Sequence, residues 1–208
     1  MPRKYEKLIR ELPPVRPIEW MFPENPRLGP QIVDAINHPV MTHHIEVFTW
    51  VRDGTDYYPD KGFDVTPERE RLKWLLDTSP SPVYETEDGR VIFHHRPMYH
   101  TTDEIFLFLG TNPNDVMDLG GEIEFWLGIG DRAEKYIINK PSVIFVPAGT
   151  VHCPIVARNV RRPIKQIIVY TRPTIVEYGV NEWPPDYKPP IEPSKYVDLK
   201  KVKLISRV

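Results

Sequence analysis

Two histidines and one glutamate are the residues of this chain best suited to hold a metal ion. His100 precedes Glu104 by four residues, and the residues between them could form a reversal that points both side chains into one cavity. His152 follows the turn-forming residues 147–149, so a further imidazole could face the same cavity. Two imidazoles and a carboxylate, with the remaining coordination positions open, suit a first-row divalent metal that also binds substrate, water or dioxygen.

Each of these three residues also has an ordinary structural interpretation. His100 could cap a turn, Glu104 could be a solvated strand start, and His152 could be a satisfied histidine at the rim of a barrel. Asp103 competes with Glu104, because only one of two adjacent strand residues faces inward. Taken singly, each residue favours the structural interpretation.

The elements that would position these side chains are strands. Between residues 86 and 172, short apolar runs alternate with turn signals at intervals of roughly ten residues, which is typical of a β-sandwich or barrel. The predicted strands are 90–95, 104–109, 122–127, 134–138, 142–146, 152–157 and 164–170. We therefore expect an all-β, antiparallel structure.

The segment before these strands, residues 1–85, is expected to be an N-terminal elaboration with proline-rich arms. Residues 44–51 are β-branched and aromatic and predict one strand. Residues 66–77 predict one short helix, in which Thr66 is the cap and Pro67 the first helical residue. The chain has 24 prolines against 11 glycines, and because proline interrupts helices and central strands, long helices should be scarce.

The segment after the strands, residues 173–208, returns to a proline-rich composition and is expected to be a C-terminal arm. The arm either packs on a second subunit or is a loosely ordered end. A chain of 208 residues is long enough for one domain with a sizeable core, so residues 1–208 are expected to form a single domain.

Composition and charge argue against several partners. The chain has 27 Lys and Arg against 29 Asp and Glu, so its net charge of -2 offers no broad attraction for nucleic acid or anionic lipid. The longest apolar runs are far below the roughly 20 residues that span a bilayer, and the N-terminus lacks the apolar segment of a secretory signal. The single cysteine, Cys153, fits a reducing compartment. A cytoplasmic location is the default expectation.

The two segments that carry the candidate ligands resemble the two conserved motifs of the cupin superfamily. The first motif is built on His-x-His, then Glu and later Gly; His100 resembles its second histidine, Glu104 its carboxylate and Gly110 its closing glycine. The second motif, Pro-x-Gly-x-x-His, is matched completely by residues 147–152. The resemblance covers residues 85–172. It implies a double-stranded β-helix (jelly-roll) barrel with a metal near its wider mouth, and a homodimer. The pairing of the motifs favours the metal site over the structural interpretation.

Some positions depart from the motifs. Met98 stands where the first motif has its first histidine, and a thioether is a poor ligand for hard divalent metals. The usual fourth protein ligand would then be missing, unless His94 or His95 replaces it through a bulge in the strand. Pro141 and Val156 replace a glycine and an asparagine of the second motif, but neither loss removes a ligand.

One acidic residue outside the motifs could also take part in chemistry. Residues 122–127 alternate so that one face of the strand bears two carboxylates and a Trp while the other face is apolar. If this face points inward, Glu124 could be a general base. A solvent-facing strand is the favoured interpretation.

From these residues and the resemblance we expect a mononuclear metal-dependent cupin enzyme that acts on a small organic molecule. The ion would be a divalent transition metal, with iron as the first choice among Fe, Mn, Zn, Ni and Cu. A dioxygenase-type oxidoreductase is the first expectation, because three protein ligands leave room for both substrate and dioxygen. The alternatives are a metal-dependent isomerase, lyase or decarboxylase, and a non-catalytic cupin that binds a small ligand.

Overall fold

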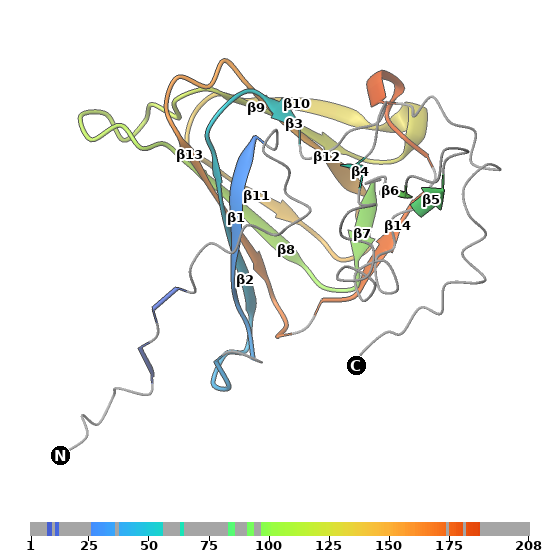
Figure 1. The fold of residues 1–208 in the computed structure, drawn as a ribbon, viewed down its shortest axis with the longest axis horizontal. Helices are drawn as coiled ribbons and strands as arrows, with labels where there is room; N and C mark the ends of the chain where they lie inside the picture. The colour runs from blue at the N-terminus through green and yellow to red at the C-terminus, as the bar shows by residue number, and fades with distance from the viewer. Residues whose placement is uncertain are drawn as a thin grey trace.

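The protein is described by a computed structural model in which strands dominate (Figure 1). The described residues are 8–9, 11–12, 26–35, 38–55, 63–64, 83–85, 91–93, 97–173, 175–180 and 182–187. Every strand pair among them is antiparallel. None of the described helices is long and apolar enough to cross a membrane.

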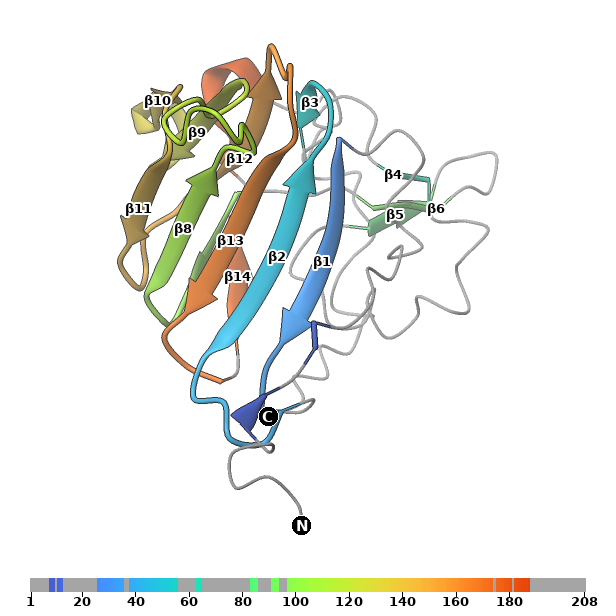
Figure 2. The ribbon, with the colours of Figure 1, turned by 90° about the vertical axis from the view of Figure 1, so that its left-hand side faces the viewer.

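Two larger sheets form the body of the fold. The first has the order β1 (Arg27–Val33), β2 (His44–Trp50), β13 (Ile164–Tyr170), β8 (Glu104–Leu109) and β11 (Ser142–Val146), and Figure 2 shows it face on. The second has the order β10 (Glu134–Ile138), β9 (Glu122–Leu127), β12 (His152–Arg158), β7 (Met98–His100) and β14 (Glu177–Gly179), and β3 (Gly54–Thr55) also pairs with β12.

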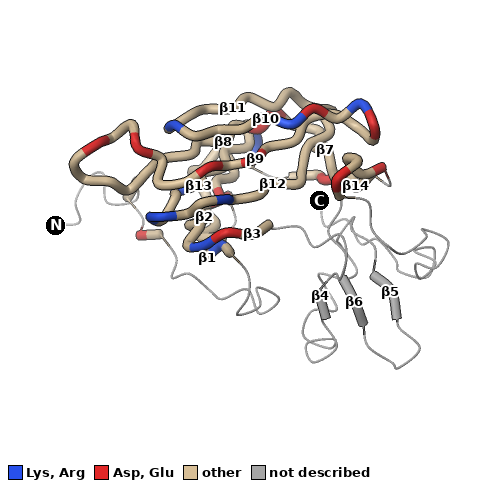
Figure 3. Tube along the Cα trace, turned by 90° about the horizontal axis from the view of Figure 1, so that it is seen from above, with Lys and Arg blue, Asp and Glu red and all other residues tan. Residues whose placement is uncertain are grey.

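The smaller elements lie outside these sheets. β4 (Phe63–Asp64), β6 (Val91–Phe93) and β5 (Val83–Glu85) form a third sheet, and η3 (Gly130–Arg132) and η4 (Pro185–Tyr187) are short 3-10 helices. The predicted strand 90–95 is therefore represented by β6, which pairs outside the two larger sheets. Acidic and basic residues are interspersed along the described chain (Figure 3).

The hydrophobic core lies between the two larger sheets. Phe106 and Phe108 on β8 contact Phe125 on β9, with ring centroids 4.9 and 6.3 Å apart and the rings nearly perpendicular. All three rings are almost completely buried, and edge-to-face contacts of this kind add to the stabilisation from burying apolar area. Alternate residues of β8 enter this core, so Glu104, in phase with Phe106, points the same way.

Most of the predicted strands are confirmed. The strands expected at 104–109, 122–127, 134–138, 142–146 and 164–170 have those bounds, and the strand expected at 152–157 continues to Arg158. The strand expected at 44–51 is β2, which pairs with β13 along its whole length. The predicted helix over 66–77 lies outside the described residues.

The sequence did not predict β1, which forms the edge of the first sheet. Its pairing with β2 shifts register between Leu28 and Gln31. Pro30 lies within this irregularity, where the missing backbone N–H does not interrupt a regular ladder. Both β1 and β2 thus belong to the first sheet, although they come from the segment interpreted as an N-terminal elaboration.

Candidate metal centre

His152 is placed by the turn that precedes β12. Gly149 adopts a φ of 81°, which favours glycine, and its N–H donates to the carbonyl oxygen of His100 at 2.8 Å. The N–H of Ala148 donates to Asp103 Oδ1 at 2.9 Å. These two hydrogen bonds join the second motif to the first, so the strand carrying His152 begins beside His100 and Glu104.

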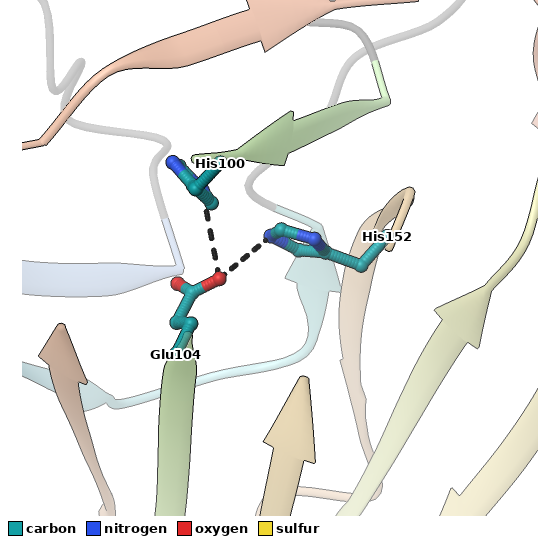
Figure 4. Close-up of side chains that lie close together, drawn as sticks. All are labelled: His100, Glu104 and His152. Carbon is teal, nitrogen blue, oxygen red and sulfur yellow. Dashed lines mark ion pairs between the residues drawn. The ribbon is translucent and has the colours of Figure 1, made fainter. Parts of the chain in front are cut away.

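The side chains of His100, Glu104 and His152 converge on one point (Figure 4). Glu104 Oε2 lies 3.5 Å from His100 Nε2 and 3.1 Å from His152 Nε2. The two imidazole centroids are 5.2 Å apart, and one ligand atom from each residue lies within 4.8 Å of the others. Each side chain is 2% exposed, so the three residues predicted from the motifs form one buried cluster.

The hydrogen bonding of His152 leaves a lone pair facing the cluster. His152 Nδ1 lies 3.1 Å from the carbonyl oxygen of Thr150, and because a carbonyl only accepts, this contact requires the proton on Nδ1. In the neutral ring Nε2 then has a lone pair, and it faces a carboxylate oxygen that also brings only lone pairs. A positive charge between these atoms stabilises the arrangement, and either a proton on Nε2 or a divalent metal ion bound to Nε2 and the carboxylate supplies it.

The electrostatics of the cluster also favour a cation. Burial lowers the pKa of His100 to about 4, against the opposing effect of Glu104. Burial acts against a charge on His152 too, but the Glu104 carboxylate raises the pKa of this imidazole above its usual value. Burial would raise the pKa of Glu104, but His152, His100 and the Tyr170 hydroxyl hold it below its usual value. The carboxylate is therefore charged, and two nitrogen ligands and one oxygen ligand fit a first-row divalent metal.

Tyr170 is a site residue that the sequence analysis missed. It lies opposite Glu104 in the pairing of β13 with β8 and donates a hydrogen bond to the Glu104 carboxylate. Burial raises the pKa of Tyr170 well above its usual value, and Glu104 raises it further, so the hydroxyl keeps its proton. The tyrosine ring also packs edge-on against His100, with centroids 5.1 Å apart. The sequence indicated only which face of the predicted strand 164–170 Tyr170 lies on. It did not show that Tyr170 pairs with Glu104, because the cross-strand register was unknown.

Met98 and Glu177 flank the cluster on β7 and β14. Met98 is buried, lies two residues before His100 on the same strand face, and pairs in register with His152. Glu177 pairs in register with His100. Met98 thus occupies the place of the missing motif histidine. His94 and His95, the predicted substitutes, lie outside the described residues.

Two other acidic candidates point elsewhere. Asp103 accepts the backbone hydrogen bond from Ala148, and its side chain is not part of the ligand cluster. Glu124 lies on the face of β9 opposite the buried Phe125, where its carboxylate accepts hydrogen bonds from Trp126 and Tyr187. It is buried, not solvent-facing as favoured from the sequence, and it does not point toward the cluster.

The described geometry agrees with the fold that the motif segments imply. Two antiparallel sheets enclose one core, and both motif segments place their candidate ligand residues at strand ends that meet inside the fold. The structure is thus an all-β fold, as the resemblance to the cupin superfamily implies, and it carries a buried His-Glu-His cluster that could hold a metal ion.

Comparisons with known proteins find only distant similarity. No protein-family model and no curated protein matches the sequence. A solved oxalate oxidase in complex with the substrate analogue glycolate is 11% identical, with a TM-score of 0.45 over 82% of this chain and 63% of that chain. An oxalate decarboxylase of Bacillus subtilis with Mn(II) centres is 13% identical, with a TM-score of 0.39 over 74% of this chain and 28% of that chain. The chain therefore spans less than two thirds of the length of these proteins.

Proposed function

We propose that this protein is a cupin that binds one divalent transition metal ion, iron first, through His100, Glu104 and His152. The observation that carries the proposal is the convergence of three buried ligand atoms within 4.8 Å of one another. His152 Nε2 and the charged Glu104 carboxylate lie 3.1 Å apart, and a metal ion that displaces the proton from Nε2 would supply the positive charge that favours this contact. Histidine nitrogen with a single carboxylate is a ligand set of non-haem iron and related first-row metals.

We further propose that the metal-loaded protein is a dioxygenase-type enzyme acting on a small organic molecule. A bound ion with three protein ligands would offer open coordination positions to a chelating substrate and to dioxygen. The residues of the chain hold and orient this site: Tyr170 fixes the Glu104 carboxylate, and Thr150 fixes the tautomer of His152. Phe106, whose ring lies 5.7 Å from that of His152, gives the site an apolar neighbour.

The metal proposal is tested by elemental analysis of protein purified without added metal. The wild-type protein should carry close to one ion per chain, and His100→Ala and His152→Ala should each lose it. His43→Ala is the matched control, because His43 is exposed, lies outside the cluster and forms a hydrogen bond with Thr42. Wild-type metal content in both site variants would show that the assignment is wrong.

The reaction class is tested with the metal-loaded protein and a panel of small hydroxyl- and carbonyl-bearing compounds. An oxygenase should consume dioxygen with at least one of them and be inactive under strict anoxia. Turnover under anoxia would instead support a metal-dependent isomerase, lyase or decarboxylase. This second candidate needs an acid or base near the ion, and Glu177, beside His100, is a carboxylate in that position. Saturable binding without any turnover would support a non-catalytic ligand-binding cupin.

A further inference from the structure

The outer face of the first sheet carries two rows of apolar side chains. Alternate residues of β8 and β13 enter the core, so the residues between them point away from it. Figure 2 looks onto this outer face, with the second sheet behind it. In the strand register, the first row across the sheet consists of Phe145, Ile105, Val169, Ile45 and Val33. The second row consists of Val143, Leu107, Ile167, Val47 and Gln31. Every side chain of these rows except Gln31 is apolar, and we call the two rows the apolar band.

The side chains of the apolar band are in contact with solvent. On the edge strand β11, Val143 is 67% and Phe145 57% exposed, and the residues of the band on β8, β13, β2 and β1 are each partly exposed. An antiparallel sheet with one face in water normally alternates between apolar residues inside and polar residues outside. Here both faces of the sheet are apolar in the same segments. A contiguous exposed apolar patch of this kind marks a contact surface.

Residues of opposite charge flank the apolar band at its two ends. Asp103 directly precedes β8, at the end of the sheet where the Ile105 row lies. Lys165 lies at the other end, between Leu109 and Thr49 in the register, and its Nζ donates a hydrogen bond to Thr49 Oγ1 at 2.8 Å. The face therefore has an uncharged middle, an acidic end and a basic end.

We propose that the apolar band is the interface of a homodimer, in which the first sheets of two copies pack face to face. Sheets pack in this way with their strand directions within about 30° of each other. A two-fold axis brings the same patch of each copy together, so apolar rows meet apolar rows. An axis that runs along the rows also reverses the strands of the second copy. The Lys165 end of one copy then lies over the Asp103 end of the other.

The size of the face suits a dimer. With neighbouring strands about 4.8 Å apart and a rise of about 3.4 Å per residue, a five-stranded sheet with roughly five residues in each strand covers about 400 Å² in projection. Side chains make the accessible surface larger than this projection, so two such faces bury roughly 1,000 Å² or more together, as a specific interface requires. A strongly charged partner would find no complementary charge within the apolar band. A second copy matches the band in both shape and polarity.

Sedimentation of the full chain in the analytical ultracentrifuge tests the dimer. The wild type should be a dimer at micromolar concentration with or without metal, because Ile105 faces outward while the neighbouring Glu104 faces the candidate metal centre. The double variant Val143→Glu, Phe145→Glu should raise the dissociation constant of the dimer on the order of a hundredfold or more, because the interface would bury the new carboxylates against apolar side chains. Both positions are exposed, so the variant should fold, and circular dichroism checks this. Val143→Glu alone is the milder variant should the double variant fail to fold.

Val176→Glu is the matched control, because Val176 is also an exposed valine but directly precedes β14 of the second sheet. This variant should remain a dimer. A folded double variant that stays dimeric, or a control that dissociates, would overturn the proposal. A monomeric wild type would overturn it as well. If that monomer co-sedimented with phosphatidylcholine vesicles, the apolar band would bind a lipid surface, and if it did not, the band would bind a different protein.

Discussion

Tyr170 and Glu104 lie directly opposite each other on the neighbouring strands β13 and β8, and the tyrosine hydroxyl donates a hydrogen bond to the glutamate carboxylate. The pair sits in a row across three strands, since His44 on β2 is opposite Tyr170 on its other side. The ring of Tyr170 also contacts both His44 and His100. One aromatic side chain thus orients the carboxylate of one candidate ligand and packs against the imidazole of another.

Replacing Tyr170 by phenylalanine should weaken metal binding while preserving the packing of the ring. Loss of a partner that orients a metal ligand typically costs roughly tenfold or more in affinity, and we expect a loss of that size. The measurement is the metal dissociation constant, obtained by competition with a chromogenic chelator. Tyr178→Phe, on the exposed side of β14, is the control and should bind as the wild type does. An unchanged dissociation constant in folded Tyr170→Phe would show that the hydroxyl does not support Glu104.

Much of the fold could be predicted from the sequence because alternation and turn residues are local signals. β8 and β13 alternate between buried and more exposed residues, and the predicted bounds agree with the structure. β14 could not be predicted, since three residues in a proline-rich tail carry no period. This tail was predicted to be an arm, but part of it packs on its own chain. Trp183 is buried, and the Tyr187 hydroxyl donates a hydrogen bond to Glu124.

Some residues of the candidate site could likewise be predicted from the sequence, and others could not. His100, Glu104 and His152 were found because turns and motif spacing are properties of short segments. Tyr170 and Glu177 were not found, because their roles depend on which strands pair and in which register. Register follows from packing across the whole barrel, and a single sequence shows only the phase within each strand.

Two adjacent carboxylates provide a matched pair of variants. Glu104→Gln should abolish metal binding, because an amide neither carries the charge that His152 faces nor ligates as strongly as a carboxylate. Asp103→Asn should retain the metal, because the asparagine oxygen can still accept the backbone hydrogen bond from Ala148. Elemental analysis of both proteins is the measurement. If Glu104→Gln kept the metal and Asp103→Asn lost it, Asp103 and not Glu104 would be the metal ligand, contrary to the phase of the strand.

Met98 offers a gain of function. It is buried, on the same strand face as His100 and opposite His152, so Met98→His should supply a fourth ligand and tighten metal binding by about tenfold or more. Met98→Leu keeps a similar volume without a ligand atom and should leave affinity near that of the wild type. Chelator competition measures both. Weakened binding in Met98→Leu would indicate that the thioether itself contacts the ion and that the site takes a softer metal.

Glu124 should stabilise the fold, and this contribution should depend on pH. Its carboxylate accepts hydrogen bonds from Trp126 Nε1 at 2.7 Å and the Tyr187 hydroxyl at 2.9 Å, and it pairs with Arg158 at 3.1 Å. Burial acts to raise the pKa of Glu124, but these donors hold it below its usual 4.5. The charged form is thus favoured by folding, so its stabilisation is present above pH 4.5 and is lost as the pH falls through the lower folded-state pKa.

Glu124→Gln should therefore reduce the free energy of unfolding by roughly 1–3 kcal/mol at neutral pH. The glutamine amide would place N–H groups against the donors of Arg158. The difference from wild type should shrink below pH 4.5, because the wild-type carboxylate then also loses its charge. Urea unfolding of both proteins across the acidic pH range measures this difference in the free energy of unfolding. Glu122→Gln is the control: it removes a carboxylate that is bonded to the exposed Asn159, and its free energy of unfolding should change little. If the free energy of unfolding differed between Glu124→Gln and the wild type by the same amount at every pH, the shape of the Glu124 side chain, and not its charge, would hold Tyr187 in place.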